Sequence, residues 1–382
     1  MYIWNHRQWP HFIYDRAAII PALLKLRYAQ GTLDSAINLL DDNARMQVVS
    51  RMLAFETLKN SEIEGEYLDV ASVWSSVTRR LGSPDISPKK DDREEHAVAI
   101  LFDAMQDKQP MTKERILDWH ESLFVGVSPK ARPPQVGQYR VGPVYLLSGR
   151  TVGRERIVYE GVPHQRVEEE MSMLIDWIQG ENGDGERVVQ SALAHLWFVC
   201  IHPFSDGNGR LSRTLSEYIL ALDHEISKQH YSVSSQIMTE RATYYEKLSS
   251  VSTQNTSMDV TEWVLWYVEM VGRAMEAWAD SITMTIKVSR TVSRLNPIQF
   301  NHRQITMLVK LVEGSLYGKL TTSKWTKIAK CSVDSAGRDI NVLIEKGLLV
   351  RSSSGGRSTS YDLALDFELV VQALAGEKEK LS

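Results

Sequence analysis

The segment 202–213, with the sequence HPFSDGNGRLSR, constrains the fold of this chain most strongly because it separates two helical patterns. Apolar residues recur at near-helical spacing through residues 188–201 before it. They recur every three or four residues after it, at Leu211, Leu215, Ile219 and Leu222. Pro203 disfavours a helical conformation of the preceding residue and so ends the first helix at His202. We therefore expect a helix–loop–helix with a polar, glycine-rich junction.

The junction also contains the residue types that a phosphate-transfer site needs. They are a potential base, a potential metal ligand, two glycines around an amide, and two arginines: His202, Asp206, Gly207, Asn208, Gly209, Arg210 and Arg213. Glycines let backbone N–H groups converge on an anion, and a following helix directs its positive N-terminus at that anion. Arginines neutralise phosphate oxygens, and a carboxylate holds Mg²⁺ beside substrate phosphates. Each residue alone has an ordinary structural explanation, but two cations at a helix start need a negative partner, which favours a phosphate site.

The segment resembles the Fic-family signature His-x-Phe-x-(Asp/Glu)-Gly-Asn-Gly-Arg-x-x-Arg at every fixed position. This resemblance implies a mainly α-helical fold that transfers AMP from ATP to a hydroxyl side chain of a target protein. It implies His202 as the general base, Asp206 as the Mg²⁺ ligand, Gly207, Asn208 and Gly209 as the phosphate cradle, and Arg210 and Arg213 as clamps of the β- and γ-phosphates.

A second motif lies at residues 60–66, with the sequence NSEIEGE, at the end of a helical pattern. It resembles the inhibitory helix of Fic proteins that carry their own inhibitor N-terminal to the catalytic core (class II), with the pattern (Ser/Thr)-x-x-x-Glu-(Gly/Asn). Glu64 and Gly65 match the end of that pattern. Asn60 stands where Ser or Thr is usual, and Ser61 follows it. We expect Asn60 to make the same polar contact.

The resemblance implies that inhibition works by charge competition. Glu64 would pair with Arg213 and take the space that the ATP γ-phosphate needs, which leaves the α-phosphate misaligned for in-line attack. A desolvated pair of an arginine and a carboxylate is hard to displace. The alternative is that Glu64 is a surface carboxylate at a helix end that Gly65 terminates.

Two further pieces resemble parts of the Fic core. The apolar runs Val141–Leu147 and Arg156–Pro163 are strand-like and separated by glycines, as in the β-hairpin flap over the active site. An ordinary hairpin that covers the core is the alternative. Tyr244 and Tyr245 lie where the family has a tyrosine pair in the adenosine pocket. Neighbouring residues face different directions on a helix, so we expect at most one of them to contact the base.

Three blocks organise the chain: an N-terminal helical domain at 1–85 with the inhibitory helix, a Fic catalytic domain at 86–297, and a domain at 298–382. The first block is expected to contain helices over 17–26, 33–40 and 70–81, and a polar link over 83–92 follows it. The third block has three short helical patterns and two strand-like runs joined by SSSGGR, which resembles a winged helix-turn-helix. The expected fold class is therefore mainly α.

The C-terminal block could bind DNA through Ser335 and Arg338 on its third helix and Arg351 and Arg357 on the wing. Residues 301–382 contain 12 Lys and Arg against 9 Asp and Glu, so the block is only mildly basic. Asp334 and Asp339 are expected to flank the reading face, which favours a protein-interaction or dimer module over a DNA reader.

Composition narrows the function classes. The net charge of −4 gives no general field for nucleic acid, and the chain has no zinc-spaced Cys/His cluster and no Walker phosphate loop. No run of 18 apolar residues and no signal-peptide layout is present, so we expect no membrane partner. With only two cysteines in 382 residues, we expect a cytoplasmic protein without a disulfide framework.

We therefore predict an autoinhibited protein adenylyltransferase that uses ATP and Mg²⁺, releases pyrophosphate, and modifies a hydroxyl of a target protein or of itself. Removal of AMP from a target, transfer of a phosphoryl or other phospho-group, and a nucleotide-sensing DNA-binding regulator stay open as alternatives. The target, the modified residue and the formation of a homodimer stay open too.

Overall fold

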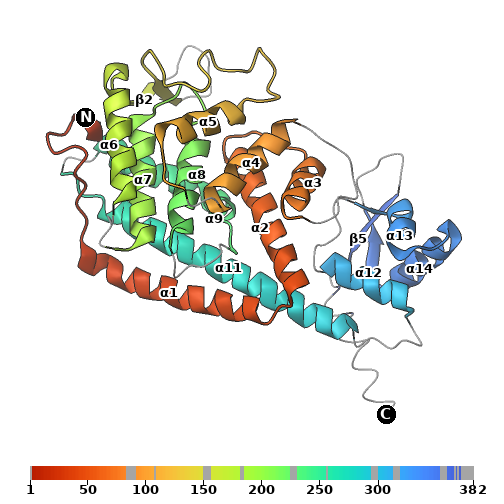
Figure 1. Ribbon diagram of the computed structural model, residues 1–382. Helices are drawn as coiled ribbons and strands as arrows, with labels where there is room; N and C mark the ends of the chain where they lie inside the picture. The colour runs from red at the N-terminus through yellow and green to blue at the C-terminus, as the bar shows by residue number, and fades with distance from the viewer. Residues whose placement is uncertain are drawn as a thin grey trace. The chain divides into compact units, whose positions relative to one another are not determined.

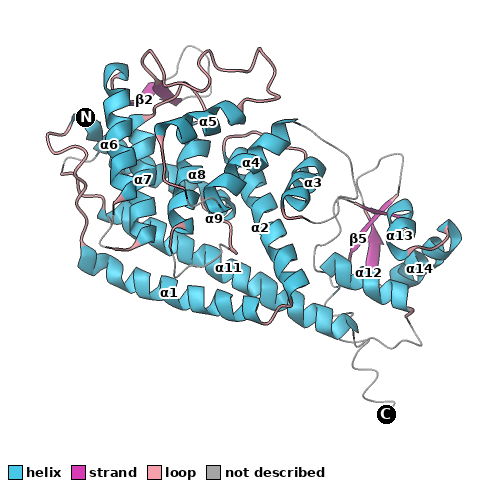
Figure 2. Ribbon diagram, viewed as in Figure 1, coloured by secondary structure: helices cyan, strands magenta, loops and turns pink. Residues whose placement is uncertain are grey.

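The computed structural model describes residues 2–82, 92–106, 109–148, 156–180, 185–223, 230–254, 257–293, 300–312, 319–352, 359–364, 367 and 370. These residues are mainly α-helical, with two small antiparallel sheets (Figure 2). The chain divides into two compact units, one of residues 1–41 and 48–279 and one of residues 42–47 and 280–382. The predicted mainly α fold class is confirmed. The three-domain division remains a prediction, and the expected link at 83–92 lies outside the described residues except for Asp92.

The elements follow one another along the chain in the order drawn in Figure 1. Up to the flap they are η1 (Ile3–Asn5), α1 (Arg16–Asn38), α2 (Asp42–Ile63), α3 (Val70–Arg80), α4 (Asp92–Gln106), α5 (Lys113–Leu123), β1 (Tyr145–Ser148) and β2 (Arg156–Glu160). After it come η2 (His164–Arg166), α6 (Val167–Gln179), α7 (Arg187–Ile201), α8 (Asn208–Ala221), α9 (Val233–Thr239), α10 (Arg241–Gln254) and α11 (Thr261–Ser293).

The first helix differs from expectation. The sequence pattern predicted separate helices over 17–26 and 33–40, whereas α1 is one continuous helix from Arg16 to Asn38. Its buried face, with Leu26, Ala29 and Leu33, continues across Gly31 without a change of phase. Glycine inside a helix costs about 1 kcal/mol, and burial of this continuous apolar row offsets that cost.

The pair α7–α8 forms the centre of the first unit, as the two helical patterns around 202–213 predicted. Nearly every side chain of α7 is buried. Trp263 of α11 packs there and donates its indole N–H to the carbonyl of Ala192 at 2.8 Å. Helix α4 packs against the other helix of the pair, α8. The loop between α7 and α8 is thus held by a rigid, buried scaffold, which is the usual support for a functional site.

A β-hairpin packs over this centre, as the two strand-like runs predicted. Strands β1 and β2 pair antiparallel, with Tyr145 opposite Glu160 and Leu146 opposite Tyr159. The N-terminal segment holds the hairpin through Trp4, whose indole N–H donates to the carbonyl of Glu160 at 2.8 Å. The connecting glycines of the hairpin lie outside the described residues.

The second unit contains the elements that the C-terminal pattern predicted, plus one more strand. They are α12 (His302–Val312), β3 (Leu320–Thr321), α13 (Thr322–Ala329), α14 (Val333–Glu345), β4 (Leu349–Arg351) and β5 (Ser360–Leu363). The strands form an antiparallel sheet in the order β3-β5-β4. Trp325, Ile340 and Leu343 are at the centre of its own apolar core. The winged-helix assignment and a DNA-binding role remain predictions, and Arg357 lies outside the described residues.

One expectation for this unit is wrong. Asp339 was expected to flank a reading face together with Asp334, but its side chain is buried. It accepts hydrogen bonds from Arg303 Nε at 2.8 Å and from Asn301 Nδ2 at 2.7 Å. The Asp339 carboxylate can be buried because two donors from the start of α12 satisfy its hydrogen-bonding capacity. Asp339 therefore does not oppose a nucleic acid at the surface.

No helix among the described residues is both long and apolar enough to span a membrane.

Candidate active site at the α7–α8 junction

The junction loop is closed by its own asparagine. Asn208 Oδ1 accepts from the N–H of Phe204 at 2.9 Å, and Asn208 Nδ2 donates to the Phe204 carbonyl at 2.8 Å. Gly207 precedes α8 with φ +84°, a conformation that favours glycine. The amide of Asn208 is thus engaged in shaping the loop, and any contribution to a phosphate cradle would come from its backbone.

His202 lies at the end of α7 and faces a cavity. Its backbone adopts φ 54°, in the left-handed region, directly before Pro203. Nδ1 donates to the carbonyl of Val199 at 3.2 Å, because a carbonyl can only accept, and this leaves Nε2 as the unprotonated nitrogen. Burial lowers the pKa of His202 to about 4. The imidazole is therefore neutral near pH 7 and can accept a proton.

The buried Arg140 holds the backbone of His202 in place. Arg140 Nε donates to the carbonyl of His202 at 2.7 Å, and its Nη1 donates to the carbonyl of Gly142 at 2.7 Å. Nη2 donates to the carbonyl of Val162, beyond the end of β2. One guanidinium thus ties the hairpin segment to the backbone of the candidate base. No sequence pattern indicated this role of Arg140.

The cavity beside His202 has a volume of about 270 Å³. Its lining combines residues of β1, β2, α7 and α10 with Glu64 and Gly209: Leu146, Val158, Tyr159, Val199, Tyr244, Tyr245, Leu248, Ser249, Ser252 and Thr253. Apolar and aromatic groups dominate, as in sites that bind the flat apolar part of a ligand. Tyr244 and Tyr245 both line this cavity, and the expectation that at most one of them contacts the base stays a prediction. Tyr244 is buried and Tyr245 is 40% exposed.

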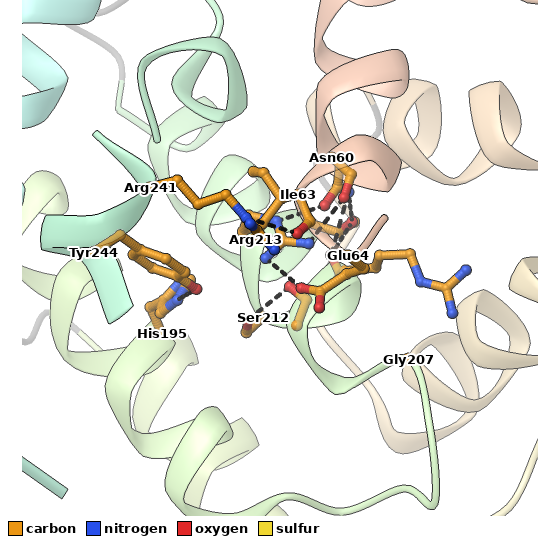
Figure 3. Close-up of polar contacts among 12 residues, drawn as sticks. Asn60, Ile63, Glu64, His195, Gly207, Ser212, Arg213, Arg241 and Tyr244 are labelled. Carbon is orange, nitrogen blue, oxygen red and sulfur yellow. Dashed lines mark hydrogen bonds and ion pairs between the residues drawn. The ribbon is translucent and has the colours of Figure 1, made fainter. Parts of the chain in front are cut away.

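Arg213 is the most deeply buried cation of the site, with its side chain 1% exposed. Helix α2 and the turn that follows it supply three acceptors for it (Figure 3). Asn60 accepts from Nε through Oδ1 at 2.7 Å and from Nη2 through its carbonyl at 2.9 Å. Glu64 Oε1 lies 2.9 Å from Nη1. The ion pair that the sequence predicted across about 150 positions is present.

The charge of Arg213 is stabilised by this arrangement. Burial opposes the charged form, but Glu64 together with Tyr244 and Tyr245 outweighs burial and raises the pKa of Arg213 above its ordinary value. Asn60 also donates through Nδ2 to the carbonyl of Arg210 and to Thr214 Oγ1, both at 3.3 Å. Asn60 therefore connects the inhibitory segment both to Arg213 and to α8.

The Glu64 carboxylate also fills the space above Gly209. A Cβ atom built on Gly209 would collide with Glu64 Oε1, so a side chain at this position would require the carboxylate to move. Gly209 lies in the first turn of α8, where backbone N–H groups point at an anion. The space that the sequence analysis reserved for phosphates at this glycine is thus occupied by a carboxylate of the same chain.

Residues 61–66 form a defined helix cap. The N–H of Gly65 donates to the carbonyl of Glu62 at 2.9 Å, and the N–H of Glu66 donates to the carbonyl of Ser61 at 3.1 Å. Gly65 has φ +79°. This pattern is a Schellman motif, which needs a left-handed residue at the position of Gly65. Ser61 contributes its carbonyl to the cap. Glu64 and Glu66 are the residues directly before and after Gly65, and their side chains contact arginines outside the cap.

Arg210 is paired with a carboxylate that the sequence analysis did not assign. Arg210 Nη1 donates to Glu66 Oε2 at 2.8 Å. Arg93, in the first turn of α4, donates through Nη2 to the same oxygen at 2.6 Å. The ring of Phe124 lies 5.3 Å below the Arg210 guanidinium. The available signal was an acidic residue two positions after Glu64, which alone does not indicate a partner.

Asp206 is the exposed carboxylate of the junction, with a side chain 56% exposed. Its Oδ1 accepts from the N–H of Gly207 at 2.6 Å and lies 3.8 Å from Arg210 Nη2. The described residues contain no group of three or more His, Cys, Asp or Glu side chains that could hold a metal ion. A single accessible carboxylate fits Mg²⁺, which takes one or two carboxylates and completes its shell with waters and substrate phosphates.

Two buried histidines support the site without having been predicted. His120 stacks on Phe204 at 3.8 Å between ring centroids, accepts at Nδ1 from the N–H of Gly137 and donates from Nε2 to the carbonyl of Asp206. Burial lowers its pKa to about 4. Both ring nitrogens are thus used to hold the backbone around the junction. A histidine inside a helical pattern does not indicate from sequence which backbone groups its ring will hold.

His195 performs a related task on the other side of α8. Ser216 Oγ donates to the carbonyl of Ser212 at 2.9 Å, so it accepts from His195 Nδ1 at 2.9 Å. His195 Nε2 then accepts from the hydroxyl of Tyr244 at 2.9 Å. Burial lowers the pKa of His195 to about 3. The chain of hydrogen bonds fixes the ring of Tyr244 at the cavity wall.

Comparison with known proteins finds a family model that matches the part of the chain containing this site. Residues 110–220 match the model of the Fic/DOC family, and residues 2–83 match a domain of unknown function (DUF4172). A solved Fic family protein from Desulfovibrio desulfuricans G20 is 20% identical, with a TM-score of 0.50 over 91% of this chain and 97% of that one. At this identity the likeness shows a shared fold.

Curated relatives are named protein adenylyltransferases. The protein adenylyltransferase fic-1 of Caenorhabditis elegans is 31% identical over 106 residues, which are 28% of this chain and 18% of that relative. The protein adenylyltransferase Fic of Nematostella vectensis is 24% identical over 236 residues, 59% of this chain and 48% of that relative. The chain therefore spans less than half the length of each of these two relatives.

Proposed function

Residues 110–220 belong to the Fic/DOC family, and on that premise we propose that the chain is a protein adenylyltransferase that its own residues 60–66 hold inactive. The observation that carries the proposal is the position of Glu64, whose carboxylate pairs with Arg213 and fills the space above Gly209. A cation at a helix start beside a glycine is a phosphate site. A carboxylate in that place is a competitor of phosphate.

In this proposal the nucleotide spans the cavity and the junction. The base and ribose of ATP lie in the cavity of about 270 Å³ between Tyr244, Tyr245 and the hairpin. The phosphates lie at the first turn of α8, where Arg210 and Arg213 neutralise them. Asp206 would hold Mg²⁺, which neutralises phosphate charge when bound.

His202 then acts as the general base. Its Nε2, left unprotonated by the bond from Nδ1 to Val199, takes the proton of a target hydroxyl. The hydroxyl oxygen forms a bond to the α-phosphorus while the bond from that phosphorus to the bridging oxygen of pyrophosphate breaks. The products are a target O–AMP ester, pyrophosphate and a protonated His202. The target is a protein with an accessible Ser, Thr or Tyr hydroxyl, and this chain itself is one such protein.

Inhibition follows from shared space. The γ-phosphate would have to displace Glu64 from a fully buried arginine whose other acceptors come from Asn60 near the end of α2. Charge-assisted hydrogen bonds of this kind are about twice as strong as neutral ones. With Glu64 in place, ATP would bind with its phosphates displaced. The α-phosphate would then not be aligned for in-line attack by the hydroxyl that His202 deprotonates.

The test is transfer of label by the Glu64→Gly variant. The variant is incubated with ATP labelled on the α- or the γ-phosphate, and protein-bound label is measured for wild type, Glu64→Gly and Glu64→Gly/His202→Ala. We expect α-label on the protein with Glu64→Gly only, and no γ-label. Retention of γ-label would identify phosphoryl transfer instead. Equal α-label for wild type and Glu64→Gly over a range of ATP concentrations would refute autoinhibition.

A second arm addresses the pairing itself. Glu64→Gly in an Arg213→Ala background should lose the gain, because the released arginine is the group that the γ-phosphate would use. A further assay separates transfer of AMP from its removal. The target is first modified with AMP, and the loss of AMP is then followed without ATP in the presence of wild type or Glu64→Gly. Faster loss of AMP with wild type than with Glu64→Gly would favour the alternative in which Glu64 positions a water.

A further inference from the structure

Glu66 lies between two arginines from different helices. Its Oε2 accepts from Arg210 Nη1 at 2.8 Å and from Arg93 Nη2 at 2.6 Å. One oxygen between two guanidinium groups is the arrangement that a phosphate oxygen adopts between two arginines. Neither Glu66 nor Arg93 belongs to the signature segment 202–213.

Arg210 has more N–H donors than Glu66 satisfies. The side chain of Arg210 is 4% exposed, and its Nε is buried without a hydrogen-bond partner among the described residues. Phe124 holds the plane of the guanidinium from one side. A buried donor without a partner costs about 1–3 kcal/mol, so its persistence at a site points to a ligand that satisfies it. The Nε–H points along the guanidinium edge that it shares with Nη2, whereas Glu66 reaches only Nη1. A polyphosphate has oxygens enough to contact Nε as well as the side that Glu66 occupies.

The Schellman cap couples Glu66 to the contact already described. Glu64 and Glu66 flank Gly65, and the N–H of Glu66 is bonded to the carbonyl of Ser61 within the same cap. One rigid turn therefore delivers one carboxylate to Arg213 and the next to Arg210 and Arg93. Two carboxylates of one turn thus occupy two neighbouring cationic positions.

We propose that Arg93 and Arg210 form a second phosphate subsite for the nucleotide, and that Glu66 occupies this subsite in the resting protein. Arg93 is then a nucleotide-binding residue, and Glu66 is a second competitor beside Glu64. The proposal rests on the proposed function in one respect, that the displacing anion is a phosphate of a nucleotide. Its ligand chemistry is the polyphosphate of a nucleoside triphosphate.

The first experiment measures binding in a background that cannot turn over. Affinities for Mg·ATP and for adenosine are measured by calorimetry in His202→Ala, with Glu66→Gln or Glu62→Gln added. Glu62 is the matched control, because it lies in the same cap and pairs with Lys59 instead of the arginines. Loss of one partly exposed charge-assisted competitor should tighten Mg·ATP binding by about threefold to tenfold. Adenosine should be unaffected, and Glu62→Gln should change neither ligand.

The second experiment separates a ligand from a structural partner. Arg93→Gln is added to His202→Ala/Glu66→Gln, where Arg93 has already lost Glu66. A phosphate ligand predicts Mg·ATP binding weaker by about threefold to tenfold and unchanged adenosine binding. The matched control is Arg80→Gln, because the Arg80 side chain is equally exposed and pairs with Glu95. No effect of Arg93→Gln in this background would overturn the proposal.

The outcomes are independent of the activity assay. Thermal midpoints of all variants are compared first, and a variant that does not fold is replaced by Arg93→Lys or Glu66→Asp, which keep the charge and change its reach. If the binding results hold while Glu64→Gly transfers no AMP, the phosphate subsite stands and the adenylyltransferase proposal fails. If AMP is transferred but Glu66→Gln binds Mg·ATP like its parent, the second competitor is refuted alone.

Discussion

Replacement of Asn60 by alanine tests the inhibitory segment without touching its carboxylate. Asn60 Oδ1 accepts from the buried Arg213 Nε at 2.7 Å, and Nδ2 makes two longer bonds to α8 at 3.3 Å. A hydrogen bond to a charged group contributes about 1.5–3 kcal/mol, and the longer neutral bonds about 0.5 kcal/mol each at most. Asn60→Ala should therefore lower the free energy of unfolding by about 2–3 kcal/mol.

The same change should loosen inhibition only in part. The carbonyl of residue 60 and Glu64 keep two of the three acceptors of Arg213 in the variant. Self-modification by Asn60→Ala should therefore exceed that of wild type and stay below that of Glu64→Gly. Urea unfolding followed by circular dichroism gives the stability, and transfer of α-labelled AMP to the protein gives the activity.

Lys59→Ala is the matched control for this experiment. Lys59 lies next to Asn60 and pairs with Glu62 on the helix surface at 2.6 Å. Such a surface pair contributes about 0.5 kcal/mol or less. If Asn60→Ala costs no more than Lys59→Ala, or transfers as much AMP as Glu64→Gly, the assigned hydrogen bonds do not hold the segment in place.

Other predictions follow from single residues. His202→Ala should reduce AMP transfer by Glu64→Gly by about 10²–10⁴-fold with Mg·ATP affinity unchanged in calorimetry, and near-normal transfer would remove His202 from the role of base. Because burial lowers its pKa to about 4, transfer should not fall between pH 8 and pH 6, and a sharp loss near pH 6.5 would contradict a neutral resting imidazole. Asp206→Asn should raise the Mg²⁺ concentration needed for half-maximal ATP binding, and an unchanged requirement would refute its role as ligand. The pKa of buried His120 lies near 4 in the folded state and near 6.5 unfolded, so the unfolded chain binds the proton first as the pH falls. The free energy of unfolding should drop by up to about 3 kcal/mol between pH 6.5 and pH 4 from this residue, and urea midpoints of wild type and His120→Gln that fall in parallel would show otherwise.

Helix positions could be predicted from apolar spacing wherever the spacing kept one phase. The helices around 202–213 and the hairpin strands were expected in the right places because burial on one face requires that periodicity. The expectation failed at α1, where two helices over 17–26 and 33–40 were predicted and one continuous helix across Gly31 is found. A local preference of about 1 kcal/mol for breaking the helix does not outweigh a buried row that extends on both sides of it.

The identity of the candidate site was also present in the sequence, since seven residues at fixed spacing define its chemistry. Glu64 and Arg213 could be paired in advance only through the family resemblance, because no local pattern links residues about 150 positions apart. The roles of Arg93, Glu66, Arg140 and His195 could not be read in this way. Each of these residues is ordinary in its own helix or turn, and its partner comes from another part of the chain.

The sequence by itself thus determined the helical framework, the residue types of the junction and the acidic turn at 60–66. Only the tertiary structure decided that Glu64 lies above Gly209, that Glu66 bridges Arg210 and Arg93, and that both tyrosines reach one cavity. The physical reason is that local patterns and tertiary contacts act over different distances along the chain. Periodicity and capping act over a few residues, whereas a charge pair depends on how whole helices pack and on which buried donors remain to be satisfied.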